Sequence, residues 1–135
     1  MLNGLTQINI ELSSVCDKAV LCPFCGHQND KINPQAKGQM DFELLRKIER
    51  ELFDSYNSRG PLPLIVQFHR DGEPTAYEYL GAALDLFGNF ITSIVTHGEN
   101  LAKKADEIID KCDVVTVSAF NGDQDIDLQL ASIKE

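Results

Sequence analysis

The chain has 135 residues, of which 43% are hydrophobic and 24% are charged, and its formal net charge at pH 7 is -9. This composition supports one packed domain and excludes a disordered chain, while the negative charge and the lack of any Lys/Arg run disfavour direct binding to nucleic acid. No apolar run approaches the roughly 20 residues of a membrane span, and the first residues lack the features of a signal peptide. We therefore expect a cytoplasmic protein with no membrane partner.

The first half of the chain predicts a strand, a loop, a helix and a second strand. Residues 7–13 alternate apolar and polar side chains, which is typical of a strand, and a cysteine-bearing stretch follows at once. The polar residues 29–39 predict a loop, after which Asp41 is the expected N-cap of a helix that ends near residues 57–61. The apolar positions of this helix recur at helical spacing and are Leu45, Ile48, Leu52 and Tyr56. Residues 64–68 form a short apolar run of the kind buried in a parallel sheet.

The second half continues the alternation. A second helix is predicted to end at Gly88 as a C-cap glycine, with a core stripe of Tyr79, Leu80, Ala83, Leu84 and Phe87. Residues 90–95 predict a third strand and residues 114–117 a fourth; the helix between them carries the apolar stripe Leu101, Ala105, Ile108 and Ile109. Residues 121–125 read as a solvated turn. A fourth helix is indicated after this turn by the spacing of Ile126, Leu130 and Ile133.

This order of elements predicts an α/β fold. The connections between strands are too long for hairpins, so the strands are expected to be parallel, with the helices packed outside the sheet. A complete eight-stranded barrel of this kind needs about 250 residues. We therefore expect residues 1–135 to form about four βα units, with an open sheet edge through which the chain self-associates.

Three of the four cysteines lie close together and are candidate metal ligands. Cys16, Cys22 and Cys25 have the spacing C-x5-C-x2-C, which places three soft thiolates on one loop. A structural zinc site needs four ligands, for which His27 is the nearest candidate. Three cysteines without a fourth favour an iron-sulfur cluster over zinc, but both alternatives remain open on spacing alone. Cys112 lies apart from the others and is expected to be a small buried hydrophobic residue.

Four segments together resemble the radical S-adenosylmethionine (radical SAM) superfamily. Residues 10–25 are similar to its first strand and cluster loop, with the aromatic Phe24 before the last cysteine. Residues 71–74 (DGEP) resemble the motif that closes the second strand, and residues 96–98 (THG) resemble the motif that closes the third. Ser118 stands where a serine often ends the fourth strand. Three features depart from the usual pattern. The interval between Cys16 and Cys22 is longer, Asp71 replaces the first glycine of the second motif, and His97 replaces the usual asparagine of the third.

The resemblance implies a partial barrel of the radical SAM type and assigns roles to these residues. Cys16, Cys22 and Cys25 would bind a four-iron, four-sulfur (4Fe-4S) cluster whose open iron chelates S-adenosylmethionine. The S-adenosylmethionine contacts would come from Phe24, Asp71, Gly72, Glu73 and Ser118. Reductive cleavage would give a 5'-deoxyadenosyl radical that abstracts hydrogen from an unknown substrate, with electrons from a flavodoxin- or ferredoxin-like donor.

A second hypothesis is a non-catalytic module that binds zinc or an iron-sulfur cluster and interacts with another protein. The unusual cysteine spacing and the small number of βα units favour it. His69 and His97, at the ends of two predicted strands, are either ligands or acid-base groups, or hydrogen-bonded structural residues.

Overall fold

The computed structural model describes residues 5–18, 25, 37–57, 64–119 and 126–134. These residues build a four-stranded sheet in the order β1-β2-β3-β4, and every neighbouring pair is parallel. The strands are β1 (Gln7–Asn9), β2 (Ile65–Phe68), β3 (Ile91–Thr96) and β4 (Val114–Val117). The predicted parallel α/β arrangement is confirmed.

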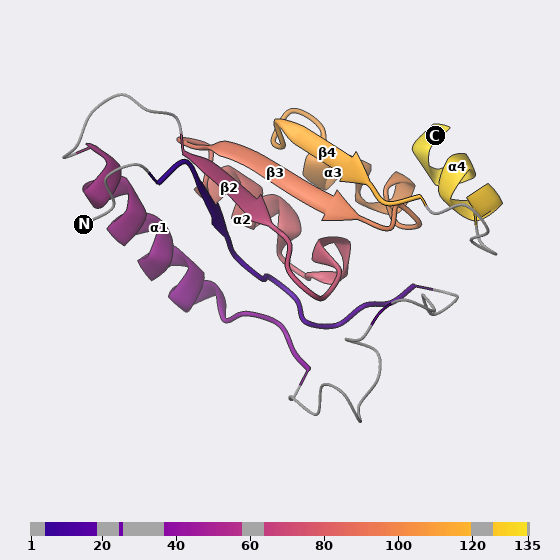
Figure 1. Ribbon diagram of the computed structural model, residues 1–135, viewed down its shortest axis with the longest axis horizontal. Coiled ribbons are helices and arrows are strands. Elements are labelled where there is room, and N and C mark those ends of the chain that lie inside the picture. The colour runs from indigo at the N-terminus through magenta and orange to yellow at the C-terminus, as the bar shows by residue number, and fades with distance from the viewer. Residues whose placement is uncertain (1–4, 19–24, 26–36, 58–63, 120–125, 135) are drawn as a thin grey trace.

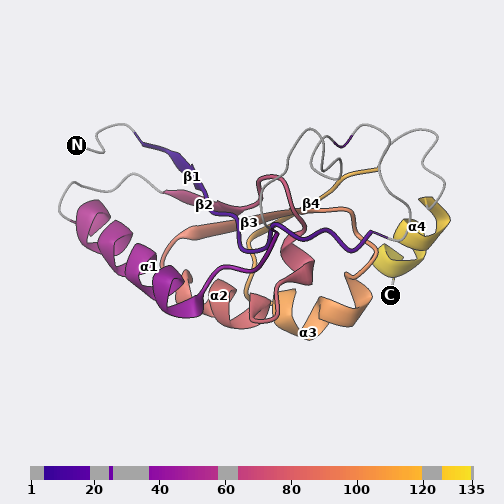
Figure 2. The same cartoon turned by 90° about the horizontal axis from the view of Figure 1, so that it is seen from below.

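In the part of the chain that the structure describes, helices cover one face of the sheet and leave the other without helices, as Figures 1 and 2 show. These helices are α1 (Phe42–Asn57), α2 (Leu80–Leu86) and α3 (Ala105–Ile108), and two short 3-10 turns, η2 (Pro74–Ala76) and η3 (Ala102–Lys104), precede α2 and α3. Helix α4 (Ile126–Lys134) lies beyond the carboxyl end of β4 in Figure 1. Sheet and helices together form an open arc, so the expected partial barrel is confirmed. Within the described residues, no helix has the length and apolar character needed to cross a bilayer.

The hydrophobic core lies between the sheet and these helices. Alternate strand residues face the helices, and Val66, Phe68 and Ile94 are fully buried. The helices contribute apolar residues that the sequence predicted. The buried ones include Leu45, Leu52, Leu80, Ala83, Leu84 and Phe87. The rings of Phe68 and Phe87 pack edge to face, with their centroids 5.2 Å apart. This packing fixes where the carboxyl ends of the strands lie.

Helix α1 begins as predicted. The Asp41 carboxylate accepts a hydrogen bond of 3.0 Å from the Leu44 N–H, which satisfies one of the unpaired donors of the first turn. The carbonyl of Asp41 also accepts the first helical bond, from Leu45.

Strand β1 is shorter than the predicted strand of residues 7–13. The Ile10 N–H still bonds to the Gln67 carbonyl of β2, but the chain then leaves the sheet. Leu12 and Ser14 instead bond through their backbones to Met40 and Gly38. A sequence pattern of period two does not distinguish a strand in the main sheet from an extended segment that pairs with a distant loop.

The second predicted helix differs in two details. Tyr79 is 50% exposed rather than part of the core, and Tyr77 is the buried aromatic, with its hydroxyl donating to the Met40 carbonyl at 2.9 Å. Helix α2 does end before Gly88, but Phe87 caps it and Gly88 lacks the left-handed conformation of a C-cap glycine. The only positive φ at a described glycine belongs to Gly98.

The last two helices expose apolar residues that were expected to be buried. Ile108 is buried, but Ile109 is 63% exposed because α3 ends after a single turn. On α4 the polar Gln129 and Ser132 face inward, whereas Leu130 and Ile133 are 43% and 46% exposed. Gln129 Nε2 donates to the Ser118 carbonyl, and Ser132 Oγ accepts from the Ala102 N–H. These hydrogen bonds determine which face of α4 contacts the rest of the chain.

Candidate cofactor site

The segment after β2 is held against the segment after β1. One carboxylate oxygen of Glu11 accepts hydrogen bonds from the N–H groups of Asp71 and Gly72, at 2.9 and 3.1 Å. A Cβ atom on Gly72 would overlap the carbonyl oxygen of Ser13. Position 72 therefore requires glycine because the two backbones touch there.

The buried carboxylate of Glu73 joins the ends of two strands. Its Oε1 accepts hydrogen bonds from the Thr75 N–H at 3.0 Å and from the hydroxyls of Thr75 and Thr96, both at 2.6 Å. Its Oε2 accepts from the His97 N–H at 3.0 Å. Glu73 is only 3% exposed, so these four donors supply the compensation that a buried carboxylate needs.

The segment after β3 contains a sharp turn. Gly98 has a φ of +87°, and a Cβ atom there would lie 2.8 Å from Cγ1 of Val117 on β4. Its N–H donates to the Thr96 hydroxyl at 3.1 Å. The Ser118 N–H in turn bonds to the Thr96 carbonyl, so the ends of β3 and β4 are also joined.

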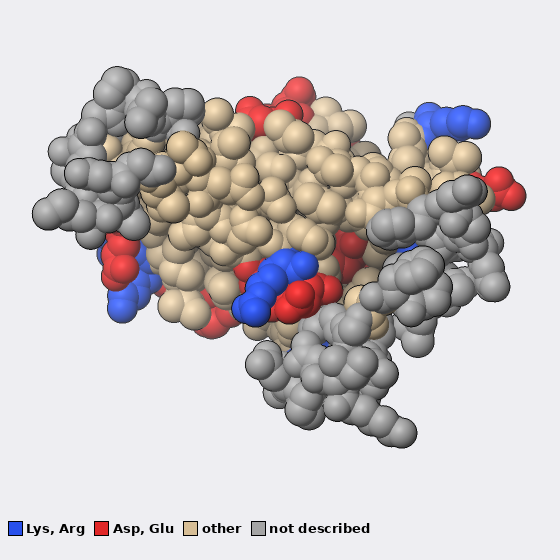
Figure 3. Space-filling view, viewed as in Figure 1, with Lys and Arg blue, Asp and Glu red and all other residues tan. Residues whose placement is uncertain are grey.

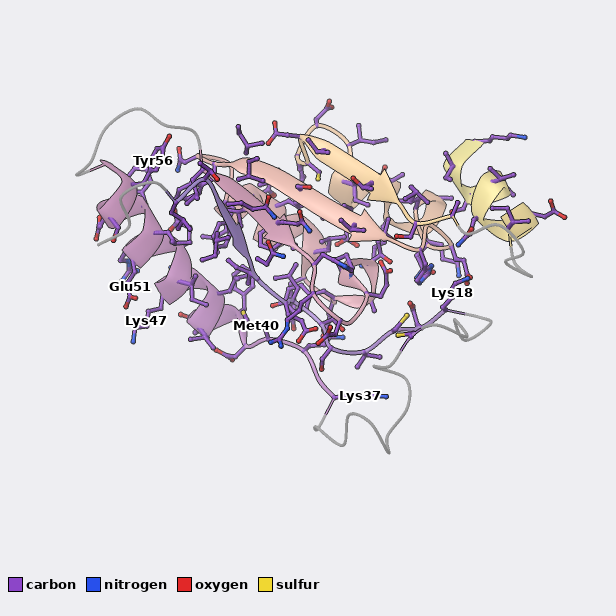
Figure 4. The ribbon with its side chains drawn as sticks, viewed as in Figure 1. Lys18, Lys37, Met40, Lys47, Glu51 and Tyr56 are labelled. Atoms are coloured by element: carbon purple, nitrogen blue, oxygen red, sulfur yellow. The ribbon has the colours of Figure 1, made fainter. Side chains whose placement is uncertain are left out.

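The residues on both sides of Cys16 contact these strand ends. The Val15 carbonyl accepts a hydrogen bond of 2.9 Å from the Glu73 N–H. The Asp17 carboxylate lies 3.2 Å from Nε2 of His97, and Lys18 Nζ lies 3.3 Å from Glu99 Oε1. Both Lys18 and Glu99 have almost fully buried side chains in this ion pair. Figure 4 shows Lys18 near the carboxyl end of β3, at the opposite end of the molecule from Tyr56 on α1.

The base of the cysteine loop is closed by a second set of contacts. Ser14 Oγ both accepts from the Gly38 N–H at 2.8 Å and donates to the Gly38 carbonyl. The Gln39 amide donates to the Ala76 carbonyl and accepts from the Glu78 N–H, at 3.0 Å in both cases. The two chain segments that flank the loop are thereby fixed to each other and to the segment after β2.

The predicted metal ligands are described only in part. Cys16 and Cys25 are half-buried cysteines. Cys22, Phe24 and His27 lie outside the described residues. Among the residues that are described, no group of three or more metal-binding side chains lies together. The three-cysteine ligand set therefore stays a prediction.

The other predicted positions fall at one edge of the sheet. Asp71, Gly72, Glu73 and Ser118 all follow the carboxyl ends of their strands, as the sequence predicted. His69 is half-buried, and its Nδ1 has no hydrogen-bond partner among the described residues. Cys112 lies at the amino end of β4, and burial raises the pKa of its thiol, which keeps it protonated near neutral pH. This agrees with its expected role as an inert, partly buried residue.

Three residues of the site were not singled out from the sequence. Glu11, Asp17 and Lys18 each make contacts with residues at least 60 positions away. Glu11 and Asp17 lie within five residues of Cys16, so their closeness to the cysteine loop was the available signal. Nothing in the local sequence predicts the partners of Lys18.

Comparisons with known proteins bear on the fold. No protein-family model matches the sequence, and no curated protein matches it. Among solved structures, the chain is similar to the crystal structure of BtrN in complex with AdoMet and 2-DOIA, with a TM-score of 0.58 and 24% sequence identity over 74% of this chain. The two chains share a fold. The match spans 39% of the BtrN chain.

Proposed function

We propose that this chain is the cofactor-binding part of a radical SAM enzyme. In this proposal Cys16, Cys22 and Cys25 bind a 4Fe-4S cluster, and the neighbouring strand ends bind S-adenosylmethionine. The cluster and S-adenosylmethionine would supply a 5'-deoxyadenosyl radical for hydrogen abstraction from a substrate. A flavodoxin- or ferredoxin-like protein would donate the electron.

One observation carries the proposal. Contacts within the chain bring the start of the cysteine loop, the DGEP segment and the THG segment together at the carboxyl edge of a parallel sheet. Ligands in α/β folds bind at this edge. BtrN, whose solved structure contains AdoMet, has a similar fold, which supports S-adenosylmethionine as the ligand.

The described residues fit the proposed groups. Cys16 and Cys25 are half-buried cysteines, and cysteine thiolates are the ligand type that iron-sulfur clusters select. Because the Glu73 carboxylate already accepts four hydrogen bonds, the exposed carboxylate of Asp71 is the more accessible acceptor for the ammonium group of S-adenosylmethionine. Gly72 and Glu73 would add further backbone and carboxylate acceptors for the same ammonium group. Phe24 would approach the adenine, and Ser118 would bind the ribose or the methionine carboxylate of S-adenosylmethionine.

Anaerobic reconstitution with iron and sulfide tests the proposal. We expect a broad brown absorbance and, after reduction, an electron paramagnetic resonance signal that changes when S-adenosylmethionine is added. A chain that takes up stoichiometric zinc and no iron would contradict it. That result would favour the second hypothesis, a non-catalytic metal-binding module, in which metal stabilises the fold and S-adenosylmethionine changes nothing.

A further inference from the structure

The residue after Cys16 is fixed by two side chains of the segment that follows β3. Asp17 Oδ1 lies 3.2 Å from His97 Nε2, and Asp17 Oδ2 accepts from Asn100 Nδ2 at 2.9 Å. The Asp17 side chain is 45% exposed, whereas the His97 side chain is only 7% exposed. The residue that follows Cys16 is therefore held by a buried side chain at the edge of the sheet.

The hydrogen bonds around His97 define its tautomer. The Glu99 N–H donates to Nδ1 at 3.1 Å, so Nδ1 acts as an acceptor and carries no proton. The ring proton then lies on Nε2. This N–H points to the Asp17 carboxylate, and Glu73 Oε2 lies 3.6 Å away from the same nitrogen.

Glu73 contacts the residue before Cys16, as His97 contacts the residue after it. The Glu73 N–H bonds to the Val15 carbonyl, and the Glu73 carboxylate accepts the backbone N–H of His97. Val15, Asp17, Glu73 and His97 thus form one connected set of contacts around Cys16. Preorganisation of a ligand by a hydrogen-bonded second layer strengthens metal binding.

We propose that His97 is a positioning residue that, through its Nε2–H bond to Asp17, holds Cys16 in place at the edge formed by Glu73 and β3. The inference rests on the proposed function, because the position of Cys16 matters only if its thiolate is a cluster ligand. His97 would act through Asp17 and would not itself touch the cluster or S-adenosylmethionine.

The test measures the alkylation rate of Cys16 in the metal-free protein by iodoacetamide labelling and peptide mass spectrometry, with Cys112 as an internal reference. We expect His97→Ala and Asp17→Ala each to raise the Cys16 rate about tenfold, because each removes a hydrogen bond to a charged group. His97→Gln keeps an N–H donor at the ε position and should restore a rate within about twofold of the wild type. His69→Ala removes an imidazole from the end of β2 and should leave the rate unchanged.

A double-mutant cycle separates coupling from general loosening of the fold. If His97 acts through Asp17, the Asp17→Ala/His97→Ala chain should label Cys16 no faster than either single variant. Rates that multiply, or single variants with rates within about twofold of the wild type, would overturn the proposal. Because Asp17 is half exposed, its variant keeps the test informative if His97→Ala fails to fold.

A second measurement links the effect to the metal centre. After reconstitution, His97→Ala should lose iron to a chelator faster than the wild type and His97→Gln should not. Failure of the wild-type chain to bind iron would contradict the proposed function, while the labelling of the metal-free chain would still report whether His97 positions Cys16.

Discussion

At the residue scale, one buried carboxylate connects three segments that lie far apart in the sequence. Glu73 bonds to Val15 through its backbone and to Thr96 and His97 through its side chain. The same residue belongs to the DGEP segment that the resemblance assigned to cofactor binding. Its contacts show that the motif also has an architectural role, which is to hold the cysteine loop against the sheet.

Replacing Glu73 by glutamine tests this role. Glutamine keeps the shape but turns one acceptor into a donor that faces other donors, so we expect the free energy of unfolding to fall by about 3 kcal/mol. Urea unfolding followed by circular dichroism measures the change. Glu78→Gln, on an exposed neighbour, is the matched control and should stay within about 0.5 kcal/mol of the wild type. A loss below about 1 kcal/mol for Glu73→Gln would show that its hydrogen bonds are not needed.

Cysteine substitutions test the proposed ligand set. We expect Cys16→Ala, Cys22→Ala and Cys25→Ala each to abolish retention of the cluster, because a three-thiolate site has no spare ligand. Cys112→Ala should retain the wild-type iron content, since this residue lies at the other end of the sheet. Iron and sulfide per chain are measured after anaerobic desalting. Equal iron loss in the Cys112 variant would mean that the ligands are assigned wrongly.

At the element scale, helices α2 and α3 are joined by a carboxylate. Glu107 accepts hydrogen bonds from Lys104 Nζ at 2.7 Å and from the Gly81 N–H at 3.0 Å. Burial opposes ionisation of Glu107, but these hydrogen bonds and the charge of Lys104 outweigh it, and the pKa of Glu107 is lowered. The contact stabilises the layer of helices behind the sheet.

The lowered pKa gives the α2–α3 contact a pH dependence. A carboxylate with a lowered pKa in the folded state stabilises the fold above its unfolded pKa of 4.5, and this contribution is lost as the pH falls through the folded value. Because the Glu107 side chain is about one-third exposed, we expect it to contribute less than about 1 kcal/mol to the free energy of unfolding. Denaturant titrations measure the free energy of unfolding of the wild type and of Glu107→Gln. The two values should differ at pH 7 and converge at pH 3. A constant difference would contradict this cause.

At the scale of the whole molecule, one face and one edge of the sheet have no cover within the described residues. Figure 3 shows that the face without helices is largely free of charged side chains, which lie mainly around its rim. Val114 and Val115 on the edge strand β4 are 46% and 39% exposed. An apolar, unpaired edge is a site for pairing with another chain.

We therefore predict that the chain self-associates through β4. Sedimentation velocity should show a mass that rises with concentration over the micromolar range. Val114→Lys places a charge on the exposed edge and should shift the chain toward monomer, while Lys47→Ala on the outer surface of α1 should not. A wild-type chain that stays monomeric at high concentration would contradict the prediction.

The open arc also predicts weak activity. The four strands that the structure describes do not enclose a cavity that excludes water. If the chain has the proposed function, we therefore expect it to cleave S-adenosylmethionine poorly even with a cluster bound. A version extended by about a hundred residues, as a longer barrel would require, should form 5'-deoxyadenosine faster under anaerobic reduction. Equal turnover by the two versions, with the shorter one monomeric, would show that the arc suffices.

The sequence by itself determined the order of the strands and helices, because apolar periodicity, the Asp41 cap and the turn residues are local features. It also indicated that Asp71–Pro74 and Thr96–Gly98 lie at the carboxyl ends of strands, where parallel strands bring residues together. Only the tertiary structure decided which face of α4 is buried, why β1 ends early, and how Glu73, His97 and Asp17 meet. These outcomes depend on hydrogen bonds between residues up to 80 positions apart, which no local pattern encodes.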